Sequence, residues 1–160
     1  MTAPRPLPAT LRLCVRRRRV PGPSGATVQV SLRVPSDVSC IEEVVDLVTR
    51  HCCAGSSASQ KLRFNLRVAV AEALANAIVA GNQEDRSKSV EVNAELSGEV
   101  IRIEVTDQGE GFDPSTIATP IEPEELERPN GRGLFLIRHL VDEVHFNPQG
   151  NSICMTLRRR

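Results

Sequence analysis

The chain has 160 residues, of which 40% are apolar and only 2% are aromatic. This length is typical of one domain, which can bury roughly two thirds of the surface of its unfolded chain. Twenty basic and twenty acidic residues cancel to a formal net charge of zero, which disfavours direct contact with nucleic acid or an acidic membrane. No apolar run approaches the ~20 residues of a membrane span, and no signal-peptide core is evident. We therefore expect a cytoplasmic protein.

The cysteines fit the same compartment. There are five of them, an odd number without paired C-x-x-C spacing, as expected of free thiols in a reducing cytoplasm. The segment His51-Cys52-Cys53 suggests either a metal or redox site or plain packing near the end of a helix. Packing is the commoner role of adjacent cysteines, and we expect it here.

Residues 1–25 differ in composition from the rest of the chain. They are rich in proline, which prevents a helix from propagating, and they contain the arginine run Arg16–Arg19. We predict a flexible Pro/Arg-rich tail over residues 1–25 and one folded domain over residues 26–160. The alternation in residues 11–15 would at most add a short edge strand. The arginines would contact phosphates or an acidic partner, or they are simply solvated, which the absence of interleaved aromatic residues favours.

The folded domain is expected to begin with a strand and a helix. Apolar and polar residues alternate over residues 28–34, which predicts a half-buried strand that Pro35 ends. Ser36 or Ser39 is placed to cap the next helix, and Ser39 with Glu42 forms the pattern of a capping box. This helix should end near residues 51–55.

A second and longer helix is predicted from about Ser59 to Ala80, with Gly81 as its C-terminal stop. Leucine, valine, alanine and isoleucine recur along one face as the buried stripe. Glu72 and Asn76 are four residues apart, so their side chains lie one above the other on a different face.

The rest of the chain predicts two hairpins around one loop and one helix. Alternation over residues 90–96 and 101–105, with a turn at Ser97-Gly98, indicates a β-hairpin that delivers Asp107 at its far end. Residues 112–130 contain prolines and many acids and predict a long mobile loop. A helix is expected over about 131–141, followed by a hairpin over 144–146 and 153–157.

Two of these segments suit a nucleotide. In Asp107-Gln-Gly109-Glu-Gly111, the carboxylate can accept a hydrogen bond from an adenine amine, and the glycines let backbone approach the ring and ribose. Gly131 and Gly133 open a helix, whose first backbone N–H groups favour phosphate. Each pattern alone also fits an ordinary turn or helix start, but their order along the chain is far more specific.

The Glu72-Ala-Leu-Ala-Asn76 segment adds the remaining chemistry. Asn76 can offer an amide oxygen to a magnesium ion that keeps most of its waters and bridges phosphates. Glu72, one turn away, can act as a base for a hydroxyl or water near the γ-phosphate. A solvated helix face is the plainer alternative, which the alanine-rich surroundings of both side chains disfavour.

Over residues 26–158 the chain resembles the GHKL ATPase superfamily, and within it the small bacterial anti-sigma-factor serine kinases. The N-box resembles residues 72–77, the first glycine box residues 107–112 and the second residues 130–134. The resemblance implies an α/β two-layer sandwich in which a mixed, mostly antiparallel sheet packs on helices. It also implies ATP as the nucleotide, Mg²⁺ as its metal, and a nucleotide pocket formed by Gly109, Gly111, Gly131, Arg132 and Gly133.

The same resemblance implies roles and partners. Glu72 would be the catalytic base, Asn76 the magnesium ligand and Asp107 the adenine-binding acid. The partners would be a sigma factor and a STAS-domain anti-sigma-factor antagonist whose serine is phosphorylated, and the chain would form a homodimer. A non-catalytic ATP-gated binding module is the alternative, which retention of Glu72 disfavours. Many relatives carry a histidine where this chain has Ala80, which bears on kinase efficiency.

Overall fold

The computed structural model describes residues 14–22, 25–54, 58–116 and 131–159. Within these ranges, six strands form a single sheet in the order β1-β2-β3-β4-β6-β5, and every neighbouring pair is antiparallel. The strands are β1 (Cys14–Gly22), β2 (Gly25–Pro35), β3 (Ser89–Ser97), β4 (Val100–Thr106), β5 (Glu143–Phe146) and β6 (Ser152–Arg158).

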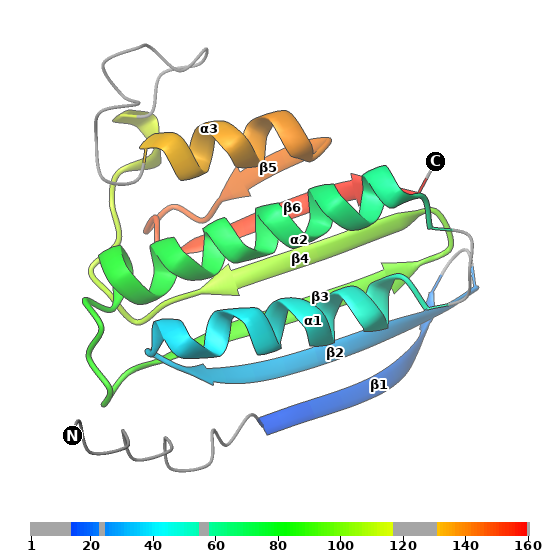
Figure 1. Ribbon diagram of the computed structural model, residues 1–160, viewed down its shortest axis with the longest axis horizontal. Coiled ribbons are helices and arrows are strands. Elements are labelled where there is room, and N and C mark those ends of the chain that lie inside the picture. The colour runs from blue at the N-terminus through cyan, green and yellow to red at the C-terminus, as the bar shows by residue number, and fades with distance from the viewer. Residues whose placement is uncertain (1–13, 23–24, 55–57, 117–130, 160) are drawn as a thin grey trace, which may run out of the picture.

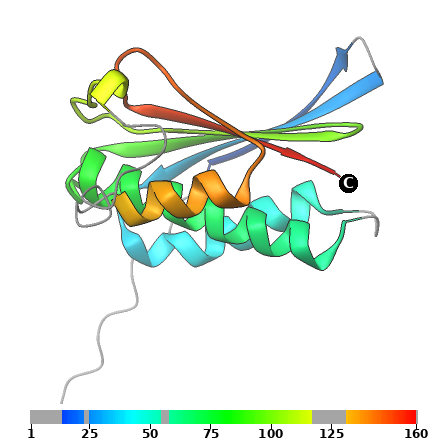
Figure 2. The same cartoon turned by 90° about the horizontal axis from the view of Figure 1, so that it is seen from above.

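Helices cover one face of this sheet, as the two views in Figure 1 and Figure 2 show. They are α1 (Ile41–Cys52), α2 (Gln60–Ala75) and α3 (Gly131–Leu140), with α2 lying between the other two. Short 3₁₀ turns, η1 (Val38–Cys40) and η3 (Pro114–Thr116), precede α1 and follow β4. The predicted two-layer α/β sandwich is confirmed, and its sheet is entirely antiparallel in the described part of the chain.

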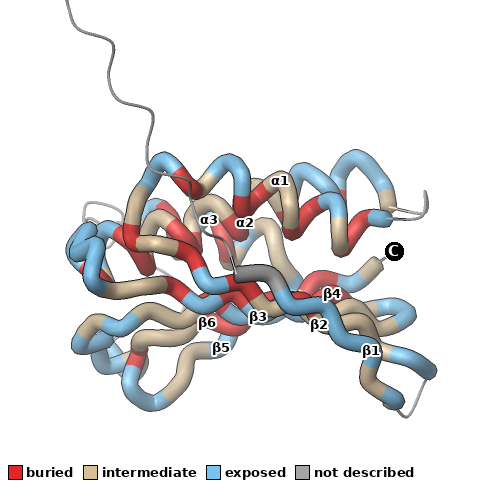
Figure 3. Tube along the Cα trace, turned by 90° about the horizontal axis from the view of Figure 1, so that it is seen from below, coloured by how far each residue is buried: buried red, intermediate tan, exposed pale blue. Residues whose placement is uncertain are grey.

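The core forms between the layers because β2, β3 and β4 alternate apolar and polar residues. Partners in antiparallel register point to the same side of a sheet, and one row across it consists of Leu32, Val92, Val105 and Ile153. All four are buried, and Figure 3 shows buried segments gathered where the helices face the strands. The opposite face is polar, and the guanidinium of Arg33 lies 3.5 Å from the carboxylate of Glu91 there.

The start of α1 differs from the prediction. The capping box of Ser39 and Glu42 does not form, because a 3₁₀ turn precedes the helix and Asp37 caps that turn. The Asp37 carboxylate accepts hydrogen bonds from the Ser39 backbone N–H at 3.0 Å and from its hydroxyl at 2.8 Å. At α2 the expected Ser59 does cap the helix, since its hydroxyl accepts from the Leu62 N–H at 3.1 Å.

The end of the second helix also differs from the prediction. Regular α-helix stops at Ala75, and residues Asn76–Gly81 form a π-helical turn, η2. Its hydrogen bond runs from the Asn82 N–H to the Ala77 carbonyl at 2.8 Å, five residues back. A π turn widens a helix and is frequent at functional sites. Here it begins at one of the predicted site residues, Asn76.

The prediction of a flexible tail is wrong for residues 14–22, which form β1. This strand pairs with β2 from Cys14 opposite Arg33 to Gly22 opposite Gly25. The arginine run hid the strand because it replaces the alternation that reveals a half-buried strand. On an edge strand, such charges discourage pairing with another chain, and Pro21 is tolerated there. The earlier part of the predicted tail lies outside the described residues, as does most of the predicted loop 112–130.

One helix of the described chain is long and apolar enough, by length and composition, to cross a membrane. It is the continuous helical stretch Gln60–Gly81, whose 22 residues include an 18-residue window with a mean hydropathy of 1.3. In this fold it is the central helix of the helical layer. Leu66, Leu74 and Ile78 are completely buried, so its apolar composition is explained by packing against the sheet and the two neighbouring helices.

Candidate functional site

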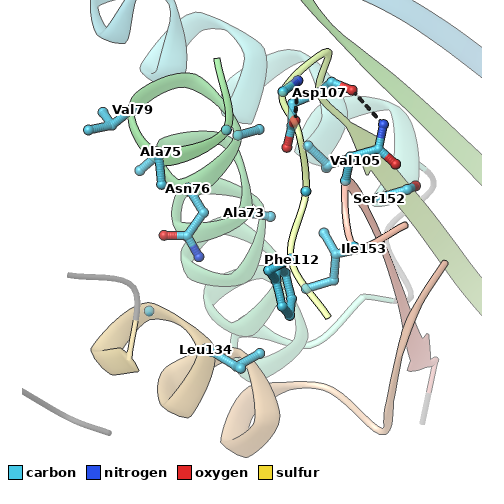
Figure 4. A pocket seen from close by; sticks show the side chains of 18 of the residues that line it. Ala73, Ala75, Asn76, Val79, Val105, Asp107, Phe112, Leu134, Ser152 and Ile153 are labelled. Atoms are coloured by element: carbon cyan, nitrogen blue, oxygen red, sulfur yellow. Dashed lines mark hydrogen bonds between the residues drawn. The ribbon is translucent and has the colours of Figure 1, made fainter. Parts of the chain in front are cut away.

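A pocket of about 1140 Å³ lies between the C-terminal part of α2, the start of α3 and the segment that follows β4. Figure 4 shows Asn76 on its helical side and Asp107 on its strand side. The structure brings every predicted site residue into the lining of this one pocket: Glu72, Asn76, Asp107, Gly109, Gly111, Gly131, Arg132 and Gly133.

The helical wall of the pocket carries Glu72 and Asn76. Both are half-buried and face the first turn of α3. The contact is so close that a Cβ atom added to Gly133 would lie 2.7 Å from Glu72 Oε2 and 3.4 Å from Asn76 Nδ2. Glycine at this position is therefore what lets α3 begin beside the acid and the amide.

The first turn of α3 supplies a second wall. Gly131, Arg132 and Gly133 open a helix of ten residues, and the first backbone N–H groups of a helix have no partner within it. Together with the helix dipole, these donors favour an anion such as phosphate. Arg132 is exposed and lines the pocket, so a fixed positive charge stands at the same end.

Asp107 is held in place from both sides. Its backbone N–H donates to the Asn151 carbonyl at 2.9 Å, and the Asn151 side chain donates to the Asp107 carbonyl at 3.0 Å. Its carboxylate Oδ1 accepts from the Gly109 N–H at 2.8 Å. Burial raises the pKa of Asp107 above its ordinary value, although the Gly109 hydrogen bond and the charge of Lys88 act in the opposite direction.

The segment after Asp107 packs against its neighbours too closely for larger residues. Gly111 has a φ of +75°, in the left-handed region, and a Cβ there would overlap the Gln149 carbonyl. A Cβ on Gly109 would overlap the carbonyl of Gly81 in the π turn. The glycines therefore allow three segments, distant in sequence, to meet at the base of the pocket.

Sequence reasoning missed several residues of the same pocket. Lys88, Asn151 and Phe112 also line it. The ring of Phe112 packs edge-on against that of Phe146, with centroids 5.2 Å apart, and so ties the segment after Asp107 to the last hairpin. No local pattern marks Asn151, because its hydrogen-bond partner Asp107 lies 44 positions away in the chain. Nothing local marks Lys88 as a pocket residue.

The cysteines predicted to pack lie in the core. Cys52 and Cys53 are buried, and burial raises the pKa of the Cys52 thiol to about 12. A protonated, buried thiol is a poor nucleophile and a poor metal ligand. Within the described ranges, no three His, Cys, Asp or Glu side chains gather in a way that could hold a metal ion.

The fold and the pocket together define a class: a two-layer sandwich with a pocket between its helices and its sheet. A family model of the histidine kinase-like ATPase domain matches residues 34–157. Since this covers most of the chain, the protein belongs to the histidine kinase-like ATPase family. The resemblance to GHKL ATPases that the motifs indicated is thereby confirmed.

Curated relatives narrow the class. The chain is similar to the serine-protein kinase RsbW of Oceanobacillus iheyensis, with 36% identity over 97 residues, which is 57% of this chain and 61% of that protein. It is also similar to RsbW of Staphylococcus aureus strains JH9 and Newman, with 27% identity over 135 residues, 79% of this chain and 84% of those proteins. The match thus spans less than two thirds of the Oceanobacillus protein and most of the Staphylococcus ones.

Proposed function

We propose that this protein is a cytoplasmic, ATP-dependent serine protein kinase that also acts as an anti-sigma factor. It binds a sigma factor and phosphorylates a serine of a STAS-type anti-sigma-factor antagonist. One observation carries the proposal: a single pocket collects the acid, the amide and both glycine segments that such a kinase requires. The similarity to serine-protein kinases of the same family supports it independently.

In this proposal the two ends of the pocket recognise the two ends of ATP. Asp107 accepts a hydrogen bond from the exocyclic amine of adenine, while Gly109 and Gly111 let the segment after Asp107 pack closely at this end of the pocket. At the other end, the backbone N–H groups of Gly131 and Gly133 and the charge of Arg132 face the phosphates. The pocket, about 1140 Å³ in volume, is large enough for a nucleotide.

Magnesium fits the donor set that the pocket offers. Asn76 contributes one neutral amide oxygen, and an ion that keeps several waters and binds substrate phosphates needs few protein ligands. When bound, magnesium supplies positive charge that offsets the charge on the phosphate oxygens. Asn76 lies one helical turn from Glu72, so the metal position and the proposed base are adjacent.

Glu72 acts on the protein substrate. Its carboxylate takes the proton of the acceptor serine hydroxyl as the serine oxygen forms a bond to the γ-phosphorus. The bond from that phosphorus to the oxygen that bridges it to the β-phosphorus breaks, and ADP leaves with the bridging oxygen. Close packing against Gly133 limits the directions in which the Glu72 side chain can turn.

The competing function is a non-catalytic module in which ATP only shapes a protein-binding surface. Such a module needs Asp107 and the glycine segments, but it has no need for Glu72 beside the phosphate end. The two functions therefore predict different outcomes for a change at Glu72.

The test is transfer of labelled γ-phosphate to a partner that co-purifies with the protein. The proposal expects a phosphoserine on the STAS-domain partner, formed only with ATP and magnesium. Absence of transfer to a partner that demonstrably binds would overturn the kinase and leave the binding module. We also propose that the chain forms a homodimer, as the resemblance implies, and light scattering with and without ATP tests this.

A further inference from the structure

Asn82 is a buried polar residue that the proposed chemistry does not use. It is 0% exposed, and it follows directly after the π turn that begins at Asn76. The next two residues, Gln83 and Glu84, have φ values of 53° and 55°, which are uncommon for residues other than glycine. The chain therefore makes an unusual turn here, with an amide side chain pointing inward.

The Asn82 side chain joins three segments that are distant in sequence. Its Nδ2 group donates to the Ser36 hydroxyl at 2.8 Å, after β2, and to the Ser89 carbonyl at 3.0 Å, at the start of β3. Its Oδ1 atom accepts from the Gln108 backbone N–H at 2.8 Å. Both donor hydrogens and the acceptor of the amide are thus engaged.

The third of these hydrogen bonds reaches the end of the pocket proposed to hold adenine, because Gln108 follows Asp107 directly. The Gln108 side chain accepts from the Ser89 N–H at 2.8 Å, so Gln108 is held at both its backbone and its side chain. On the other side, Gly81 lies so near Asp107 that an added Cβ would overlap the carboxylate. The π turn, through Gly81, and Asn82, through Gln108, therefore both limit where Asp107 can lie.

From this geometry we propose that Asn82 is a positioning residue for base recognition: it fixes Gln108, and through it the direction in which the Asp107 carboxylate points. The inference rests on the proposed function, since it concerns how the same pocket distinguishes adenine from other bases. Asn82 is not among the residues that line the pocket, so the inference gives it no contact with a bound nucleotide. Its effect on selectivity passes entirely through the backbone that carries Asp107.

An amide is required at this position because it offers donors and an acceptor together. An aspartate would place an oxygen against the Ser89 carbonyl and bring a charge into the core, which is costly without a partner. An alanine would leave the Gln108 N–H without its partner and free the loop to shift. Asn82→Ala is therefore the cleaner substitution for testing position rather than charge.

The experiment compares ATP with purine riboside triphosphate, which is ATP without the exocyclic amine. Calorimetry on the whole chain gives the ratio of the two dissociation constants. In the wild type this ratio should be about 10 to 150, the usual value of one hydrogen bond to a charged group. In Asn82→Ala it should fall below about 5, since the carboxylate is no longer aimed at the amine.

Three further variants complete the comparison: a single variant, a double variant and a control. Asp107→Asn should show the same low ratio, and adding Asn82→Ala to it should lower the ratio no further, because both act on one contact. Ser87→Ala is the matched control: it removes a 2.7 Å hydrogen bond to Asp85 in the same turn without touching Asn82. Its ratio should equal that of the wild type.

The outcomes separate the inference from the proposed function. A wild type that does not bind ATP overturns the proposed function itself. If the wild type discriminates, and Asn82→Ala weakens both ligands equally and keeps the ratio, Asn82 is merely structural and the inference is wrong. Should Asn82→Ala fail to fold, Ser36→Ala removes one of its anchors. A ratio between the wild-type and Asp107→Asn values supports the inference, and an unchanged ratio overturns it.

Discussion

Replacing Asp107 by asparagine tests base recognition with little change in shape. Gly109 decides what the new amide can do, because its backbone N–H faces the position of Oδ1 at 2.8 Å. If the amide oxygen stays there, the NH₂ group faces the adenine amine, and two donors meet. If the amide turns over, the NH₂ group meets the Gly109 N–H instead. Neither orientation satisfies both neighbours.

The expected loss of affinity is that of one charge-assisted hydrogen bond. Such a bond contributes about 1.5–3 kcal/mol, equal to about 10- to 150-fold in the dissociation constant of ATP. The fold should survive, since burial disfavours the charged form of Asp107 and the variant carries no charge there. Thermal unfolding of the variant should therefore occur at or near the wild-type temperature.

Calorimetric titration with ATP and with GTP measures the effect. Wild type should bind GTP poorly, because guanine has a carbonyl where adenine has its amine. The matched control is Asp113→Asn, an exposed carboxylate outside the pocket lining, which should bind ATP like the wild type. Equal ATP and GTP affinities in the wild type, or unchanged ATP affinity in Asp107→Asn, would show that Asp107 does not recognise adenine.

Three further predictions follow from the same geometry. Gly133→Ala should lower phosphoryl transfer by about 10²-fold, because its Cβ displaces Glu72, whereas Gly98→Ala, with open space around its Cβ, should not. Removing residues 1–22, and β1 with them, should lower the melting temperature by at least about 10 °C relative to a chain that starts at Cys14; an equal melt would contradict its place in the sheet. Burial raises the pKa of Asp107, so if this carboxylate binds adenine as proposed, ATP affinity should fall on acidification at a pH above the ordinary ~3.9 of aspartate. Over the same window its protonation should stabilise the fold, and both effects should vanish when asparagine replaces it.

The sequence predicted the lining of the pocket because its signals are local. A carboxylate at the end of an apolar strand, glycines beside it, and an acid and an amide one turn apart each follow from spacing within a few residues. Asp107 and Asn76 could therefore be placed on their elements before any tertiary contact was known. That they meet in one pocket followed from the resemblance, and the structure agrees.

The unpredicted features depend on partners far away in the chain. Asn82 bonds to Ser36 across 46 positions, and Asn151 to Asp107 across 44, so no local pattern marks either residue. The π turn likewise has no signature of its own in Asn76–Gly81, where the composition suits an ordinary helix. Gly81 likewise depends on a distant residue, because an added Cβ there would overlap the Asp107 carboxylate.

Two local signals pointed in the wrong direction. Ser39 and Glu42 matched a capping box, but Asp37 engages the Ser39 side chain first. In β1, four consecutive arginines suggested solvent on all sides, although an edge strand can carry charges on both faces and still pair on one side. The strand β1 therefore could not be predicted from its own residues, because only its pairing with β2 reveals it.

Phosphoryl transfer by the wild type and by Glu72→Ala, with ATP binding measured on both, decides whether Glu72 is the catalytic base. Glu72→Ala should bind ATP within a few-fold of the wild type, since the proposed role of Glu72 is toward the acceptor serine and not toward adenine. Transfer of labelled γ-phosphate to the antagonist should fall by about 10²–10⁴-fold, the usual contribution of a positioned base. Equal transfer by the two proteins would contradict the assignment of Glu72 and the mechanism built on it.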